Sequence, residues 1–311
     1  MSHMASEAVD EVDESVFWKI NYDQFNIRFR NTQIIRAVGE RVNKGAEAVM
    51  KAAFTIAQDK IRTCHEEQSV PLSATLVAHH LPSDAKLRSE IVVSADGTRL
   101  KPSQQQIITE FLDLLCTDRA KFLSKVDERG AGQYKVNLSN GTTALKRRLV
   151  ESVVKERYGS ISHRLFRILV ENQKLDEKQI TKIALVAGKE VREKLHQLAM
   201  AGLVELQEVP KSVDRVPSRT FYLWYVPLHK CEELIMNDCY QALANIRQRH
   251  SIEVKSRSKL LRKVQREDVI ANPGLLTALD HAQLQLLNKV LEWLEVAELR
   301  LDAMIMILRD F

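Results

Sequence analysis

The sequence is poor in cysteine, glycine and proline, and it lacks long hydrophobic runs. Only four of the 311 residues are cysteines, and none of them forms a CxxC pair. Cys231 and Cys239 lie eight residues apart with no histidine between them. We therefore expect neither a disulfide framework nor a zinc site, and free thiols are typical of a reducing, intracellular compartment. No apolar run approaches the roughly 18 residues that a membrane span needs, so we expect no contact with a membrane.

Motifs for catalysis and nucleotide binding are also missing. The chain contains no GxSxG, GxxxxGK, GxGxxG or HExxH sequence. The neighbouring residues His79 and His80 point apart on a helix and are unsuited to share a metal. The adjacent pair Cys64 and His65 is unsuited as a nucleophile and its base. We predict a protein that is not an enzyme, with no catalytic residues, no metal, no cofactor and no small-molecule substrate.

The composition favours a mainly helical, multidomain protein. Charged residues make up 28% of the chain, and glycine contributes only 10 residues, which is more typical of helices than of tight-turn β folds. A length of 311 residues predicts two or three domains. The net charge of +5 is mildly basic. It permits contact with nucleic acid without requiring it.

The segment 165–226 has the element order of a winged helix. An apolar run begins at Leu165, and a second helix opens at Asp176 with Gln179 in capping-box spacing. A third helix is predicted over 189–200, with Val191, Leu195 and Leu198 on one face and Gly202 as its left-handed cap. Two β-rich runs, 203–209 and 220–226, follow around a polar loop. The usual role of this fold is to bind nucleic acid or protein, and the fold itself provides no catalytic site.

A larger copy of the same order is predicted upstream, over 15–158. We expect a helical region from Ser15 through Phe54 and a long helix over 34–61 that is broken only by Gly39 and Gly45. A helix over 103–115 and a hairpin of 121–126 and 134–138 are expected to follow. A further helix over 143–158 is closed by Gly159. An aromatic cluster lies at helical spacing near the start, and we predict that it packs into the core rather than stacking on bases. Its members are Phe17, Trp18, Tyr22, Phe25 and Phe29.

The C-terminal part predicts an antiparallel coiled-coil hairpin. Residues 229–268 contain no proline or glycine and are predicted to be helical throughout, and Asn272-Pro273-Gly274 is a strong break. The second arm alternates spacings of three and four, as a coiled-coil seam does, with Glu298 at the one position that is not apolar: Leu284, Leu287, Leu291, Leu294, Leu301, Ile305 and Leu308. The seam of the first arm is weaker and contains Leu234, Cys239, Leu243 and Ile246.

Two groups of basic residues are candidates for contact with nucleic acid. On the third helix and the wing of the second winged helix, the candidates for DNA contact are Lys189, Arg192, Lys194, Lys211, Arg215 and Arg219. A denser basic tract lies on the hairpin and contains Arg247, Arg249, Lys255, Arg257, Lys259, Arg262, Lys263 and Arg266. Both groups suit DNA phosphates, and the tract also suits an acidic protein partner. A merely solvated surface is the alternative for each.

Several strings resemble one family, the large winged-helix subunit of the RNA polymerase III initiation heterotrimer. The most distinctive is the wing string Leu206-Gln-Glu-Val-Pro-Lys-Ser-Val-Asp-Arg-Val-Pro-Ser-Arg-Thr-Phe-Tyr-Leu223. Similar strings are Glu151-Ser-Val-Val-Lys-Glu-Arg-Tyr-Gly159, Arg164-Leu-Phe-Arg-Ile-Leu169, Val12-Asp13 and Phe17-Trp18. The resemblance implies a nuclear, non-catalytic polymerase subunit that joins two smaller subunits on the polymerase clamp and helps to position and open promoter DNA. It also implies that this chain holds the last two of four winged-helix modules plus the coiled coil.

We therefore predict a mainly α protein with small β-wings, built of tandem extended winged-helix domains followed by an antiparallel coiled-coil hairpin. The expected division is a leader or tag at 1–14, an extended winged helix at 15–158, a second winged helix at 159–228, and the hairpin at 229–311. As a scaffold, the chain is expected to bind DNA weakly and without sequence preference. The alternative is a free-standing DNA-binding transcription regulator that dimerises through its coiled coil.

Overall fold

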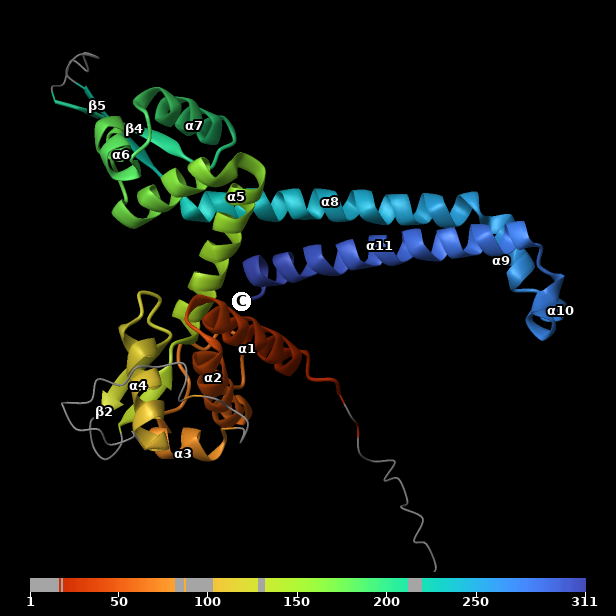
Figure 1. Cartoon of the computed structure of the whole chain (residues 1–311), viewed down its shortest axis with the longest axis horizontal. Coiled ribbons are helices and arrows are strands. Elements are labelled where there is room, and N and C mark those ends of the chain that lie inside the picture. The colour runs from red at the N-terminus through yellow and green to blue at the C-terminus, as the bar shows by residue number, and fades with distance from the viewer. Residues whose placement is uncertain (1–16, 18, 82–86, 88–102, 128–131, 212–219) are drawn as a thin grey trace, which may run out of the picture.

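The computed structural model describes residues 17, 19–81, 87, 103–127, 132–211 and 220–311. It is mainly helical, with small antiparallel sheets, as expected from the sequence (Figure 1). The expected leader at 1–14, most of the loop at 83–102 and the tips of both predicted hairpins lie outside the described residues. In the described part of the chain, no helix combines the length and the apolar character that crossing a bilayer would take.

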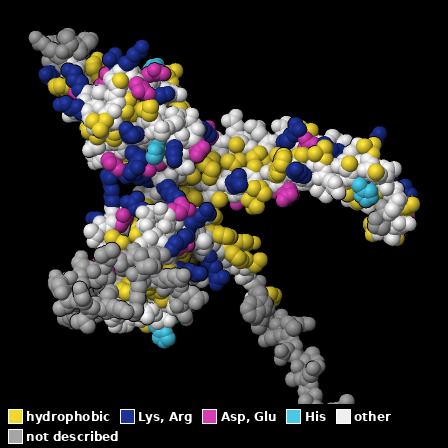
Figure 2. All heavy atoms as spheres, viewed as in Figure 1, with side chains coloured by type: hydrophobic (Ala, Val, Ile, Leu, Met, Phe, Trp, Pro, Cys, Tyr) yellow, Lys and Arg dark blue, Asp and Glu magenta, His cyan; other side chains and the backbone are white. Residues whose placement is uncertain are grey.

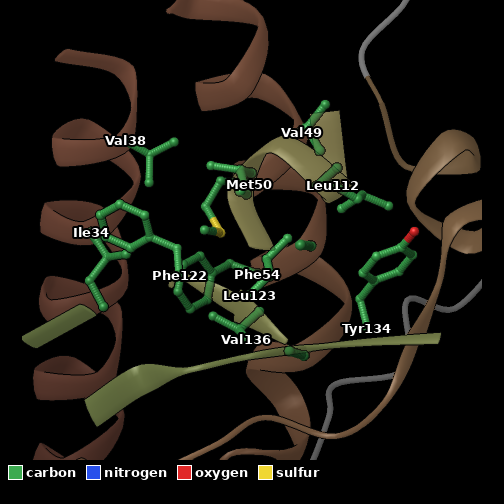
Figure 3. Packing of buried hydrophobic residues seen from close by; sticks show 14 of the residues in the cluster. Ile34, Val38, Val49, Met50, Phe54, Leu112, Phe122, Leu123, Tyr134 and Val136 are labelled. Carbon is green, nitrogen blue, oxygen red and sulfur yellow. The ribbon is translucent and has the colours of Figure 1, made fainter. Parts of the chain in front are cut away.

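The first module packs four helices against a three-stranded antiparallel sheet of order β1-β3-β2. Its elements are α1 (Tyr22–Arg41), α2 (Lys44–Ala57), β1 (Leu72–Ser73), α3 (Ala74–His79), α4 (Gln104–Thr117), β2 (Leu123–Asp127) and β3 (Gln133–Val136). A short 3-10 turn, Gln58–Lys60, follows α2. In the core, Ile34 and Val38 of α1 lie against Phe54 of α2, Phe122 and Val136 (Figure 3). The predicted inward residues of α4 are all buried: Ile107, Ile108, Phe111, Leu112 and Leu115.

Two expectations for the start of this module are wrong. The break in the predicted helix over 34–61 lies between Arg41 and Lys44 rather than at Gly39 and Gly45, because the Asn43 side chain caps a new helix by accepting a hydrogen bond from the Ala46 amide at 2.8 Å. The described members of the aromatic cluster do not enter the core. Phe17, Tyr22, Phe25 and Phe29 are all exposed, and Trp18 lies outside the described residues. The opposite face of α1, which includes Ile27, Ile34 and Val38, is the buried one.

One long element, α5 (Leu138–Asn172), joins the first module to the second. It is two helices separated at Gly159, whose φ of 84° and ψ of 177° are not helical. We call this break the elbow. The sequence prediction that a helix closes at Gly159 is confirmed. The half before the elbow packs on α1, and the half after it contributes Leu165, Phe166 and Leu169 to the core of the second module.

The second module has the winged-helix order that its sequence predicts. Helix α6 (Glu177–Ala184) begins with the expected capping box between Asp176 and Gln179. Helix α7 (Gly188–Met200) buries Val191, Leu195 and Leu198, as predicted, and Gly202 has a positive φ of 74°. Strands β4 (Glu205–Pro210) and β5 (Thr220–Tyr225) pair antiparallel and form the wing.

The C-terminal part is an antiparallel hairpin that projects from the elbow (Figure 1). Its arms are α8 (Leu228–Ser256) and α11 (Ala278–Arg309), which are in contact along the hairpin. The first arm is not continuous to 268 as predicted, because the helix is interrupted at Arg257 and again at 265–266. The tip therefore contains α9 (Ser258–Val264), α10 (Glu267–Ala271) and a 3-10 turn, Pro273–Leu275. Every predicted seam residue of α11 is buried or half-buried.

The end of α11 returns to the elbow and reaches both cores. Ile305 and Leu308 belong to the core of the second module, whereas Phe311 belongs to that of the first. On α8, Cys231, Ile235 and Cys239 are buried in the core of the second module. The two modules and the base of the hairpin are therefore packed together around α5.

Candidate interaction surfaces

The predicted DNA-contact residues of α7 lie on its solvent side, but acidic neighbours dilute their charge. Lys189 and Arg192 are exposed, while Lys194 is half-buried and lies 3.3 Å from the Gln197 Oε1 atom. The Arg192 Nε atom forms an ion pair with Glu177 of α6 at 2.8 Å. Because such exposed pairs contribute little and exchange partners readily, Arg192 remains available to a phosphate.

The wing contributes one described basic residue to this surface. The Lys211 Nζ atom lies 4.5 Å from the centre of the Phe221 ring, a cation–π contact that holds the ammonium group beside the wing. Arg215 and Arg219 lie outside the described residues. The structure thus brings Lys211 to the wing, and Lys189, Arg192 and Lys194 to the neighbouring helix α7.

The basic tract of the hairpin is largely internally neutralised. Arg249 and Arg257 both pair with Glu253, whose carboxylate is nearly buried. The remaining ion pairs of the tract are Arg247 with Glu298, Lys263 with Asp280, and Arg266 with Asp268. The hydrogen bonds from Lys263 and Thr277 lower the pKa of Asp280 to about 2. Five of the eight cations therefore serve the hairpin itself.

The other three cations of the tract, Lys255, Lys259 and Arg262, are exposed. Among the described residues, none of them lies within ion-pair distance of a carboxylate. They lie across the junction of α8 and α9, at the far end of the hairpin from the modules. This is the part of the tract whose positive charge is available to a nucleic-acid backbone or an acidic partner.

A cleft at the elbow was not predicted from the sequence. Its volume is about 580 Å³, and its lining comes from α1, from residues 119–122 and from both halves of α5. The Glu171 carboxylate meets Arg119 at 2.7 Å, Arg147 at 3.6 Å and Arg167 at 3.7 Å. Arg147 also pairs with Glu151 at 2.8 Å. We call this set the elbow network, and it joins the first module to the far half of α5.

One histidine belongs to the elbow network. The His163 Nε2 atom lies 3.9 Å from a Glu151 carboxylate oxygen. Burial lowers the pKa of His163 because the charged imidazolium loses hydration, and Arg167 adds to that effect while Glu151 opposes it. No motif could have revealed this cluster, because its members are ordinary helix-surface residues that only the bend at Gly159 brings together.

The four cysteines are described by the structure, and none of them forms a disulfide. Burial raises the pKa of the Cys231 thiol to about 12. Such a thiol is inert as a nucleophile. In the ranges that the structure describes, no group of histidine, cysteine, aspartate and glutamate is suited to hold a metal ion.

Comparisons with known proteins find two family models along the chain. The model described as "RNA polymerase III subunit RPC82" matches residues 4–145, and "POLR3C, C-terminal winged-helix domain" matches residues 150–226. The first match includes the first module from α1 to β3, and the second includes the winged helix of the second module.

Similar curated proteins are named DNA-directed RNA polymerase III subunit RPC3. The protein from Yarrowia lipolytica is 34% identical over 97% of this chain and 57% of its own length. The proteins from Danio rerio and Homo sapiens are 30% and 28% identical, each over 96% of this chain, and over 55% and 56% of their own lengths. The chain thus spans about half the length of the curated relatives that it matches.

Proposed function

Because this chain belongs to the RPC3 (RPC82) family of RNA polymerase III subunits, we propose that it is a non-catalytic scaffold of the polymerase in the nucleus. In this proposal it joins two smaller subunits to the clamp of the largest subunit and helps to position and open promoter DNA. The two winged-helix modules form the frame, and the hairpin docks on partner protein.

The observation that carries the proposal is the convergence of all three parts at the elbow. The end of α11 enters both cores through Ile305, Leu308 and Phe311, and Arg119 pairs with Glu171 across the bend. A frame fixed in this way transmits position from the hairpin to the wing instead of bending between them. Fixed geometry is what a subunit needs to hold other proteins and DNA in register.

The expected contact with DNA is weak and independent of sequence. The α7 helix carries Glu190 and Glu193 between its cations, which disfavours a helix that reads bases in the major groove. Lys189, Lys211 and the exposed part of the basic tract instead suit phosphate contacts, which position DNA without selecting a sequence.

Assembly tests the proposal directly. The chain is expressed with an affinity tag in cells of its source organism and purified through that tag. RNA polymerase III activity is measured in the purified fraction, and mass spectrometry determines the stoichiometry of the subunits. We expect the other polymerase subunits in equimolar amounts. In parallel, light scattering of the purified chain should give the mass of a 35.6 kDa monomer. The seam residues of α8 and α11 pack against each other within one chain, so a second copy is not needed to bury them.

Two results would contradict the scaffold proposal. One is purification of the chain without polymerase subunits. The other is a symmetric dimer that protects one DNA sequence tightly, which would support the free-standing regulator instead.

A further inference from the structure

The second arm of the hairpin carries more apolar surface than its partner arm covers. Beside the seam, α11 exposes Leu279, Leu286 and Trp293, which are 67%, 55% and 64% accessible to solvent. These residues are spaced by seven, so they lie in one line along the helix, as the residues of a coiled-coil seam do. We call this line the outer stripe. Figure 2 shows hydrophobic side chains exposed along the hairpin.

A groove lies at the Trp293 end of the outer stripe, next to the packed seam. Its volume is about 560 Å³, and it is lined by Ile246 of α8 and by Trp293, Val296 and Leu301 of α11. Two helices in contact leave such a channel between them, and a third helix fills it when its own apolar line meets both. The distance from Leu279 to Trp293 is 14 residues, or roughly 21 Å of helix, which matches three to four turns of an occupant.

The charges at the groove favour an acidic occupant. Lys289 and Arg300 lie four before and seven after Trp293, on the same side of the helix. The Lys289 Nζ atom lies 5.3 Å from the centre of the Trp293 ring. Among the described residues, neither Lys289 nor Arg300 pairs with a carboxylate, while Glu292 is the one acidic residue of the groove lining. Lys289 is not itself a lining residue but lies against Trp293, so at this end of the groove two cations, Lys289 and Arg300, stand against the one carboxylate of Glu292.

We propose that this groove binds an amphipathic α-helix from another subunit of the polymerase, with apolar residues repeating every seven positions and acidic residues on its flank. The result is a three-helix coiled coil in which Trp293 is the central anchor, because large aromatic residues in such pockets dominate binding energy. A second copy of this chain is disfavoured, because the groove would then bring Lys289 and Arg300 of one copy towards the same cations of the other. The inference rests on the proposed function and specifies what the hairpin binds.

A photocrosslinking experiment in the intact polymerase tests the inference. Leu286→p-benzoylphenylalanine places the probe on the outer stripe, and Leu299→p-benzoylphenylalanine places it at a position that is 68% exposed elsewhere on the same helix. The polymerase is purified through this chain and irradiated, and the crosslinked peptides are sequenced. We expect position 286 to capture a helical, acid-flanked heptad segment of another subunit, and position 299 to give no such product.

Charge reversal tests the chemistry of the occupant. The double substitution Lys289→Glu with Arg300→Glu should reduce the position 286 crosslink about tenfold, because like charges at an interface are strongly unfavourable. The matched control, Lys51→Glu with Lys60→Glu, changes the net charge equally on the first module and should leave the crosslink unchanged. The thermal unfolding midpoints of both variants and of the unchanged chain are compared, to check that each variant still folds.

Each failure has a separate signature. Suppose that the chain purifies with the polymerase but position 286 gives no crosslink, or crosslinks to a second copy of the chain, to DNA or to a segment without acidic residues. The inference is then wrong, and the proposed function stands. The inference is also wrong if the charge reversal leaves the yield of the position 286 crosslink unchanged. If the chain does not purify with the polymerase, both fail together.

Discussion

At the scale of single residues, Gly159 determines the path of α5. Its φ of 84° and ψ of 177° belong to a region that is open essentially only to glycine. A Cβ added there would meet no atom within 4 Å, so the cost of a side chain is one of backbone strain alone. We predict that Gly159→Ala lowers the free energy of unfolding by about 1–3 kcal/mol, measured by urea denaturation.

Gly188 provides the matched control for the elbow substitution. A Cβ there would also meet nothing within 4 Å, but Gly188 has no positive φ and begins α7. Gly188→Ala should therefore leave the free energy of unfolding unchanged or raise it by up to about 1 kcal/mol. An equal loss in both variants would show that the elbow conformation carries no special requirement for glycine.

His163 gives the elbow a pH dependence whose sign follows from its lowered pKa. Below the ordinary pKa of histidine, His163 is protonated in the unfolded chain but still largely neutral in the folded chain. Protonation of His163 therefore favours the unfolded state. The stability of the folded state is thus lost as the pH falls from about 6.5 towards the lower folded-state pKa. We predict that His163→Gln loses less stability than the unchanged chain between about pH 7.5 and pH 5.

The control for this pH dependence is His229, whose side chain is 84% exposed. Thermal midpoints over the same pH range are the measurement. The His229→Gln variant provides the baseline for replacing an exposed histidine by glutamine. A His163→Gln curve parallel to that of the unchanged chain would mean that this imidazole does not contribute.

At the scale of elements, periodicity predicts which residues share a face but not always which face is buried. In α11 the predicted seam residues lie on one face, and each of them is buried or half-buried. The predicted seam is therefore confirmed. Helix α1 has two candidate faces, one with Tyr22, Phe25 and Phe29 and one with Ile27 and Ile34. The structure buries the second face, and no single-sequence pattern distinguishes the two.

The buried face of α1 also contains a charge that no pattern predicts. Arg30 is fully buried, and its Nη1 atom donates to the Cys64 carbonyl at 2.6 Å. Burial lowers the pKa of this arginine. The basic candidates on α7 and the hairpin could be named from the sequence because they are clustered along it. The elbow network could not, because Arg119 and Glu171 meet only once α5 has bent.

The two apolar faces of α11 allow an element-scale prediction. Leu287 is fully buried against α8, whereas Leu299 is 68% exposed. Leu287→Ala should lower the free energy of unfolding by about 2–5 kcal/mol, the cost of a buried cavity. Leu299→Ala should change it by less than about 0.5 kcal/mol. Chemical denaturation followed by circular dichroism measures both values, and equal losses would contradict the seam as described.

At the scale of the whole molecule, the distribution of charge determines how the chain meets DNA. The net charge is only +5, and most cations of the basic tract are paired within the hairpin. Within the basic tract, the cations without a described carboxylate partner, Lys255, Lys259 and Arg262, are therefore the ones free to replace counterions on a DNA backbone. Binding should depend steeply on salt through these residues and hardly on sequence.

The salt dependence of DNA binding tests this view of the molecule. Replacing Lys255, Lys259 and Arg262 together by glutamine should reduce the slope of log K against log salt by about two to three, since each lost phosphate contact contributes about 0.9. The control replaces Lys19, Lys51 and Lys60, which are exposed on the first module, and removes the same charge. Fluorescence anisotropy with a labelled duplex measures both. Equal slopes for the two variants would mean that only net charge attracts DNA, and that the hairpin tip is not a contact.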